Sequence, residues 1–285
     1  MVEAGAANRR SRTRLSGPWT PLGSALAAFY DRGEDLSVTI RNDFGPTEEV
    51  RASLFFRGED SFEEWELIAL GQCGRRVLDV GAGVGAHALV LQARGHEVTA
   101  LEPIAEAVRI MKERGVASVR EGTIFDLPST PTYDTAMLLM NGSMIAETLS
   151  GLDGLLEAVG GVLEPDGVLV LDSTDLLQAP YAWSERNPTT ELAADSEAEP
   201  DAQIEIDSAA ESDTESAHDG RYLGELHYQL SVGDHTGDVF PQLFVDPATL
   251  KERAGLAGWS TEVIWSGTGG HYLACLRRPA HLNPR

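Results

Sequence analysis

The residues best placed to do chemistry lie in one run, residues 77–85, which read VLDVGAGVG. A short apolar segment delivers a carboxylate, Asp79, and then three alternating glycines ahead of a predicted helix. Because glycine has no Cβ, such a turn can take unusual backbone angles, and a ligand can lie against the bare main chain. The free N–H groups at the start of the next helix favour an electron-rich or anionic group. The run predicts a ligand-binding loop, and a glycine turn with no ligand is the alternative.

Two ligand classes fit this loop, and the charge at its base favours one of them. Gly81-x-Gly83-x-x-Ala86 satisfies the loose fingerprint of dinucleotide binding, and Glu102 follows Gly81 by 21 residues, near the usual position of a ribose-binding acid. The negative charge of Asp79, however, opposes a pyrophosphate and suits the ammonium of a methionine moiety. S-adenosylmethionine (SAM) has no phosphate and a zwitterionic amino-acid end. The loop is therefore interpreted as a SAM site.

The elements that must position these residues alternate between strand and helix. The sequence predicts strands at 75–80, 96–101, 117–120, 133–140 and 167–172, and helices at 86–94, 104–114 and 152–159. This alternation is typical of a doubly wound α/β fold, a mostly parallel sheet with helices on both faces. A helix at 248–257 and strands at 259–266 and 271–276 predict a C-terminal antiparallel hairpin strand.

Other segments flank or interrupt this core. A helix at 21–32 and a strand around 36–40 predict an N-terminal cap, and Ser61 with Glu64 forms a capping-box pattern for a further helix. An insertion rich in Glu, Asp, Ser and Ala cannot bury enough apolar surface to offset its chain entropy. The predicted parts are a disordered tail (1–17), an N-terminal cap (18–65), a SAM-binding core (66–183), an acidic low-complexity insert (184–220), a lid hairpin (221–245) and the C-terminal part of the core (246–278).

The composition narrows the classes of partner. The chain has 45 acidic and 22 basic residues and a net charge of −23, so its surface repels nucleic acid and anionic membranes. Adaptation to a salty cytoplasm and an acidic insert on an ordinary protein explain this charge equally well. Cys73 and Cys275 lack metal-site spacing, and no apolar run is long enough for a membrane span or secretion signal. We expect a cytoplasmic location and no bound metal.

The chain resembles the class I SAM-dependent methyltransferases, which have a Rossmann-like fold. The motifs that carry the resemblance are VLDVGAGVG (77–85), VTALEP (98–103), EGTIFDLP (121–128), YDTAMLLMNG (133–142) and LEPDGVLVLDSTD (163–175). They occur in the family's order and cover roughly residues 66–178, with a further likeness over 246–277.

The resemblance implies roles for individual residues. Asp79 and the loop residues would cradle the methionine and ribose side of SAM, and Glu102 would accept both ribose hydroxyls. The implied cofactor-binding set is Asp79, Gly81, Ala82, Gly83, Gly85, Glu102, Pro103, Thr123, Ile124, Phe125, Asp126, Met140 and Asn141. Pro103 and its neighbour Ile104 would pack on the adenine. The chain departs from the family at Thr123, where an acid often holds the adenine amino group; backbone groups of Ile124 and Phe125, or Asp126, are the alternatives.

The reaction and its acceptor are less constrained. Asn141-Gly142-Ser143-Met144 lacks the Asn/Asp-Pro-Pro-aromatic pattern of many nucleic-acid amino methyltransferases, which favours a small-molecule acceptor. Candidates for removing an acceptor proton are His227, Tyr228 and His271, none of them in a recognisable catalytic motif. The sequence thus predicts a SAM-dependent methyltransferase acting on a small molecule. An NAD(P)-dependent oxidoreductase, a non-catalytic SAM-binding regulatory module and an aminopropyl transferase are the alternatives.

Overall fold

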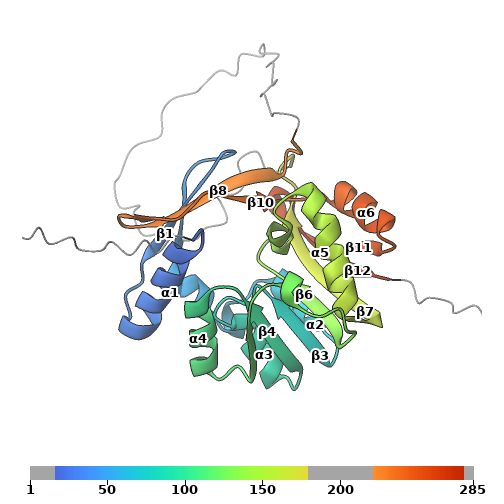
Figure 1. Ribbon diagram of the computed structural model, residues 1–285, viewed down its shortest axis with the longest axis horizontal. Helices are drawn as coiled ribbons and strands as arrows, with labels where there is room; N and C mark the ends of the chain where they lie inside the picture. Colours follow the sequence, from blue (N-terminus) through green and yellow to red (C-terminus); the bar gives the residue numbers. More distant parts are fainter. Residues whose placement is uncertain (1–16, 179–220, 279–285) are drawn as a thin grey trace, which may run out of the picture.

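The computed structural model describes residues 17–178 and 221–278, which form two β-sheets with helices around them (Figure 1). The predicted acidic insert at 184–220, and all but the last residue of the predicted tail, lie outside the described residues. None of the helices in the described part of the chain combines the length and apolar character needed to cross a membrane.

The larger sheet is the core and has seven strands in the order β11-β12-β7-β6-β3-β4-β5. The strands are β3 (Arg76–Val80), β4 (Glu97–Glu102), β5 (Ser118–Glu121), β6 (Tyr133–Leu138), β7 (Leu163–Thr174), β11 (Ser260–Ser266) and β12 (His271–Arg277). From β5 to β7 all neighbours are parallel, whereas β12 runs antiparallel to both β7 and β11. The predicted doubly wound, mostly parallel sheet with an antiparallel C-terminal strand is confirmed.

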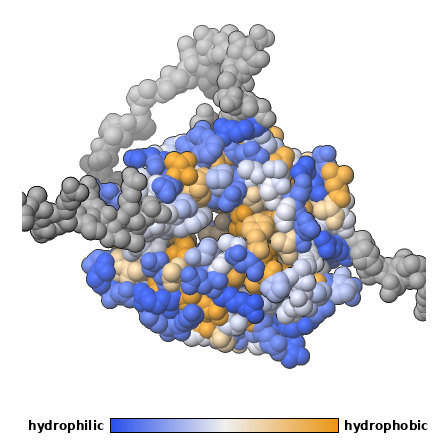
Figure 2. Space-filling view, in the orientation of Figure 1, coloured by the Kyte–Doolittle hydropathy of each residue, from blue (hydrophilic) through white to orange (hydrophobic). Residues whose placement is uncertain are grey.

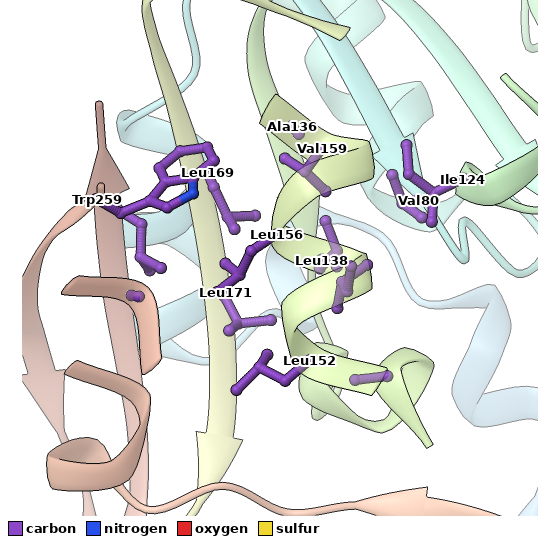
Figure 3. Packing of buried hydrophobic residues seen from close by; sticks show 14 of the residues in the cluster. Val80, Ile124, Ala136, Leu138, Leu152, Leu156, Val159, Leu169, Leu171 and Trp259 are labelled. Carbon is purple, nitrogen blue, oxygen red and sulfur yellow. The ribbon is translucent and has the colours of Figure 1, made fainter. Parts of the chain in front are cut away.

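Helices cover both faces of the core sheet because the central strands are apolar on both sides. The helices are α2 (Glu64–Gly71), α3 (Ala86–Ala93) and α4 (Ala105–Arg114) on one face, and α5 (Leu149–Val162) and α6 (Pro247–Leu256) on the other. Figure 3 shows the second layer, in which the α5 side chains Leu152, Leu156 and Val159 lie beside Leu138, Leu169 and Leu171 of the sheet.

The smaller sheet, which we call the covering sheet, is antiparallel and has the order β10-β8-β1-β2, with β9 paired to β8. Its strands are β1 (Ser37–Asn42), β2 (Glu48–Arg51), β8 (Glu225–Val232), β9 (His235–Thr236) and β10 (Phe240–Leu243). The central pair joins distant parts of the chain, because Asn42 of β1 lies opposite Tyr228 of β8. Helix α1 (Thr20–Arg32) packs between this sheet and α4 (Figure 1).

Local details differ from the sequence expectation at three places. The capping box of α2 is formed by Glu63 and Glu66, not by Ser61 and Glu64, because Ser61 ends a preceding 3-10 turn. Strand β7 begins at Leu163, earlier than the predicted start at residue 167, and its pairing with β6 is irregular there. Strand β6 ends at Leu138, two residues early, because Met140 takes a left-handed conformation.

Candidate functional site

The glycine loop connects β3 to α3 in the way the sequence suggests. Gly81, Gly83 and Gly85 have φ values of +72°, +56° and +80°, a region that side-chain-bearing residues rarely adopt. A Cβ on Gly85 would lie 2.8 Å from the side chain of Val116, so this glycine permits close packing of the loop on the core. A Cβ on Gly83 would meet nothing within 4 Å. The backbone at Gly83 therefore borders open space.

Two buried carboxylates flank this open backbone. Asp79, near the end of β3, is 3% exposed, and its Oδ2 has no hydrogen-bond partner among the described residues. Glu102, at the end of β4, accepts the N–H of Gly83 at 2.8 Å and the N–H of Ile104 at 2.9 Å. Burial raises the pKa of Asp79 to about 6, and burial with the nearby Asp79 charge raises the pKa of Glu102 to about 7. Within residues 17–178 and 221–278, neither acid forms the ion pair that a buried charge normally requires.

The segment after β5 forms a short 3-10 turn, Ile124–Asp126. The Asp126 carboxylate caps it, accepting the N–H of Thr123 at 2.8 Å and its hydroxyl at 2.7 Å. These bonds hold the pKa of Asp126 below its usual value. Ile124 is buried, whereas the Phe125 ring is 54% exposed. The structure thus leaves an ionised acid and an uncovered aromatic ring beside the end of β5.

The turn after β6 is strained and is held by Asp172 of β7. Met140 and Asn141 have φ values of +68° and +60°, a conformation that costs non-glycine residues about 1–3 kcal/mol each. The Asp172 carboxylate accepts the N–H of Asn141 at 2.8 Å and that of Gly142 at 3.1 Å. The Asn141 side chain accepts a further bond from Thr174 at 2.8 Å. These contacts keep Met140, which is 46% exposed, projecting from the sheet edge.

His271 is also part of this assembly. It begins β12, and because β12 is antiparallel to β7 it lies at the edge where β7 ends. Its Nε2 is 2.8 Å from Asp172 Oδ2, and its ring makes edge contacts with Trp65 and Trp265. The residue is 6% exposed. His271 therefore helps to hold the Asp172 carboxylate that binds the strained turn.

A charged cluster that the sequence reasoning missed adjoins the loop from the N-terminal side. Arg57 forms a two-pronged ion pair with the fully buried Glu66, at 2.9 and 3.0 Å, and His87 Nε2 lies 2.8 Å from the same carboxylate. Arg57 also approaches the sulfur of Met140 at 3.7 Å. His87 belongs to the first turn of α3. The only sequence signal for this cluster is an acid, Glu66, among the apolar residues of a predicted helix.

The other two candidate bases lie on the covering sheet and face opposite ways. His227 is exposed and lies 3.0 Å from Asp43, so the structure does not bring it to the glycine loop. Tyr228 is 5% exposed and packs against Phe240 and Phe244, and burial raises the pKa of its hydroxyl far above 10.

A surface recess of about 410 Å³ lies elsewhere, at the opposite edge of the core sheet. Arg76, Asp134 and Glu164 line it and form ion pairs with one another. Arg76 pairs with both of these acids, and the recess lies away from the glycine loop.

Comparison with known proteins identifies the core. Residues 77–167 match the family of methyltransferase domains. The chain is 30% identical over 121 residues to a cypemycin N-terminal methyltransferase from a Streptomyces species, covering 41% of this chain and 49% of that protein. It is 33% identical over 90 residues to an uncharacterized methyltransferase from Staphylococcus carnosus, covering 32% and 41% respectively. The alignments span about half or less of these relatives.

Solved structures match over more of the chain. A SAM-dependent methyltransferase from Bacteroides fragilis in complex with S-adenosyl-L-homocysteine (SAH) has a TM-score of 0.72 and 29% identity, covering 93% of this chain and 97% of that one. The CcbJ methyltransferase from Streptomyces caelestis shares the fold at a TM-score of 0.53 and 15% identity, covering 92% and 99%. Residues 77–167 are therefore similar to methyltransferase domains, and the chain as a whole shares its fold with a solved SAM-dependent methyltransferase.

Proposed function

We propose that this chain transfers a methyl group from SAM to a small-molecule acceptor. One observation carries the proposal: the buried, unpartnered Asp79 and the buried Glu102 flank bare backbone at Gly83. Bound there, SAM supplies an electrophilic methyl group on a sulfonium. An adenosyl group joined to a sulfonium and an ammonium matches two acids and an open main chain, whereas a diphosphate would meet the uncompensated charge of Asp79.

The loop residues divide the cofactor between them. Asp79 pairs with the ammonium, and the backbone of Gly81, Ala82 and Gly83 lies against the methionine and ribose. Glu102 accepts the ribose hydroxyls while its bonds from Gly83 and Ile104 fix its position, since each carboxylate oxygen can accept more than one bond. Gly85 contributes indirectly, by letting the loop pack on Val116.

The adenine lies between the ends of β4 and β5 in this proposal. Pro103 and Ile104 contact one side of the base, and the exposed Phe125 contacts the other. Asp126 accepts the adenine amino group, taking the role that Thr123 cannot fill. The low pKa of Asp126 supports this assignment, because an ionised carboxylate is the stronger acceptor. The backbone of Ile124 completes this side of the site.

The carboxylate of the methionine end needs a cation, and Arg57 is the one beside the site. Glu66 holds its guanidinium next to Met140, and His87 lies across the same acid. Met140 and Asn141 then border the transferred methyl group. Arg57 and Asp79 together would complement a zwitterion, with one charge for each end.

The transfer step needs alignment and exclusion of water more than proton chemistry. Asp172 and His271 act as positioning residues, because both are committed to holding the Met140–Asn141 turn. The covering sheet lies over this edge and is joined to it through Ser143, which bonds to the carbonyl of Leu243. An enclosed site suits a small acceptor, and the charge of −23 disfavours a nucleic acid.

Isothermal titration calorimetry with SAH and with NAD tests the proposal. We expect SAH to bind with micromolar or better affinity and NAD not to bind. A methyl-transfer screen with labelled SAM against metabolites then tests turnover. Binding of NAD in place of SAH would refute the proposal, and SAH binding without any transfer would favour a regulatory module.

A further inference from the structure

The covering sheet has an inner face, defined as the side that packs with α1. It carries Val38, Leu226, Tyr228, Leu230 and Phe240. Met144 also packs against this cluster and belongs to the 3-10 turn Gly142–Ala146, directly after the strained Met140–Asn141 turn. The inner face therefore borders the end of β6, where the methyl group is placed. In Figure 2 the molecular surface is hollowed at the centre of the view, below β8 and between α1 and β6.

Two polar side chains of this face, Glu48 and Gln242, lie among its apolar residues. Glu48 lies opposite Ile40 in the β1–β2 pairing, and Gln242 lies opposite Leu226 in the β8–β10 pairing. Directly paired residues of antiparallel strands point to the same side of a sheet, so both belong to the inner face. The influence of the Glu48 charge on the Tyr228 hydroxyl agrees with this placement.

Neither of these side chains is fully satisfied. Glu48 Oε2 and Gln242 Oε1 are buried and have no hydrogen-bond partner within residues 17–178 and 221–278. Burial alone raises the pKa of Glu48 to about 7. Unsatisfied buried polar atoms are few in native structures, and each one calls for an explanation. The same signature marks Asp79, the acid assigned to the cofactor.

Both unsatisfied atoms are hydrogen-bond acceptors, so the group that each one lacks must be a donor. A carboxylate without a neutralising group is best matched by a cation. Tyr228, whose hydroxyl feels the Glu48 charge, contacts Phe240 and Phe244, so aromatic rings lie on the same face as the acid. Acids with aromatic rings are the usual means of binding ammonium groups.

We infer that the methyl acceptor carries a protonated amine, which binds beneath the covering sheet to Glu48. This inference rests on the proposed function for the location of the reacting methyl group, but recognition of the amine depends on Glu48 alone. The amine is the group by which the protein recognises the acceptor, and it need not be the atom that receives the methyl group.

The experiment compares matched ligands on wild-type protein, with and without saturating SAH. Thermal unfolding is followed with benzylamine against benzyl alcohol, cyclohexylamine against cyclohexanol, and glucosamine against glucose. We expect the amine of a pair to raise the melting temperature more than its alcohol. We expect Glu48→Gln, which keeps the shape and removes the charge, to weaken amine binding about tenfold or more.

The matched control is Glu49→Gln, the exposed neighbour on β2 that faces away and bonds to Ser37. It should bind amines as the wild-type protein does. Equal or absent shifts for amines and alcohols, or unchanged amine binding by Glu48→Gln, would overturn the inference. Failure of SAH to bind would count against the proposed function only, because the amine comparison is also made without SAH.

Discussion

The core sheet and the covering sheet differ in how far apart in the sequence their key residues lie. The loop between β3 and α3 and the acid ending β4 come from one stretch of 26 residues, 77–102. The covering sheet pairs Asn42 with Tyr228, so its central contact joins segments separated by most of the chain. Parallel strands with alternating helices place their carboxyl ends at one edge automatically, whereas an added antiparallel sheet requires a specific register.

In the proposed function, this difference separates cofactor binding from acceptor binding. Each region holds a buried carboxylate oxygen that has no hydrogen-bond partner in the described part of the chain, on Asp79 in the core and on Glu48 in the covering sheet. We expect changes in the core to alter SAH binding and leave amine binding in place, and changes at Glu48 to do the reverse.

The largest expected effect is in the core. Glu102→Ala removes the acceptor for the ribose hydroxyls and the bonds that hold Gly83 and Ile104. Hydrogen bonds to charged groups contribute about 1.5–3 kcal/mol each, so SAH affinity should fall about a hundredfold or more by calorimetry. Glu97→Ala, an exposed acid that begins the same strand, is the control and should bind SAH normally. Unchanged affinity in Glu102→Ala would contradict the ribose role.

The joint between the two regions should show a smaller effect on stability. Ser143 is fully buried, and its hydroxyl bonds to the Leu243 carbonyl at 2.8 Å and to the Ser173 hydroxyl at 2.7 Å. Ser143→Ala leaves buried polar groups unsatisfied and should lower the free energy of unfolding by about 2 kcal/mol in denaturant titration.

The control for this joint is Ser260→Ala. Ser260 makes the same kind of bond, to the Arg277 carbonyl, but on the surface. Its loss should change the free energy of unfolding by less than about 0.5 kcal/mol. Equal losses in the free energy of unfolding would show that the buried bonds of Ser143 stabilise the fold no more than a surface bond does.

The smallest expected effect is a pH dependence confined to the core. The pKa values of Asp79 and Glu102 are raised to about 6 and about 7, and each acid must be ionised to bind its part of SAH. Affinity should therefore fall as the pH drops through these values, on the order of tenfold between about pH 7.5 and about pH 6. Glu102→Gln should flatten the upper part of this profile, and Glu48→Gln should leave it unchanged. A wild-type affinity independent of pH would rule out this ionisation requirement.

The sequence predicts the core well because its signals are local. Apolar runs locate β3, β4, β6 and β7, and the positive-φ glycines of the loop can be recognised from their spacing alone. The capping box of α2 was misplaced at Ser61 because tertiary contacts, not local preference, select Glu66. Glu66 accepts bonds from the Arg57 side chain and from the Glu63 N–H, and it lies 2.8 Å from His87 of α3.

What the sequence alone determined is the cofactor half: three glycines after Asp79 and an acid at the end of the next strand. Chain connectivity and strand direction are enough to bring these together. Only the tertiary structure decided which candidates share a site, separating Tyr228 from His227 and placing Arg57 beside Met140. The physical reason is that strand register and buried ion pairs depend on partners far along the chain, which local spacing does not encode.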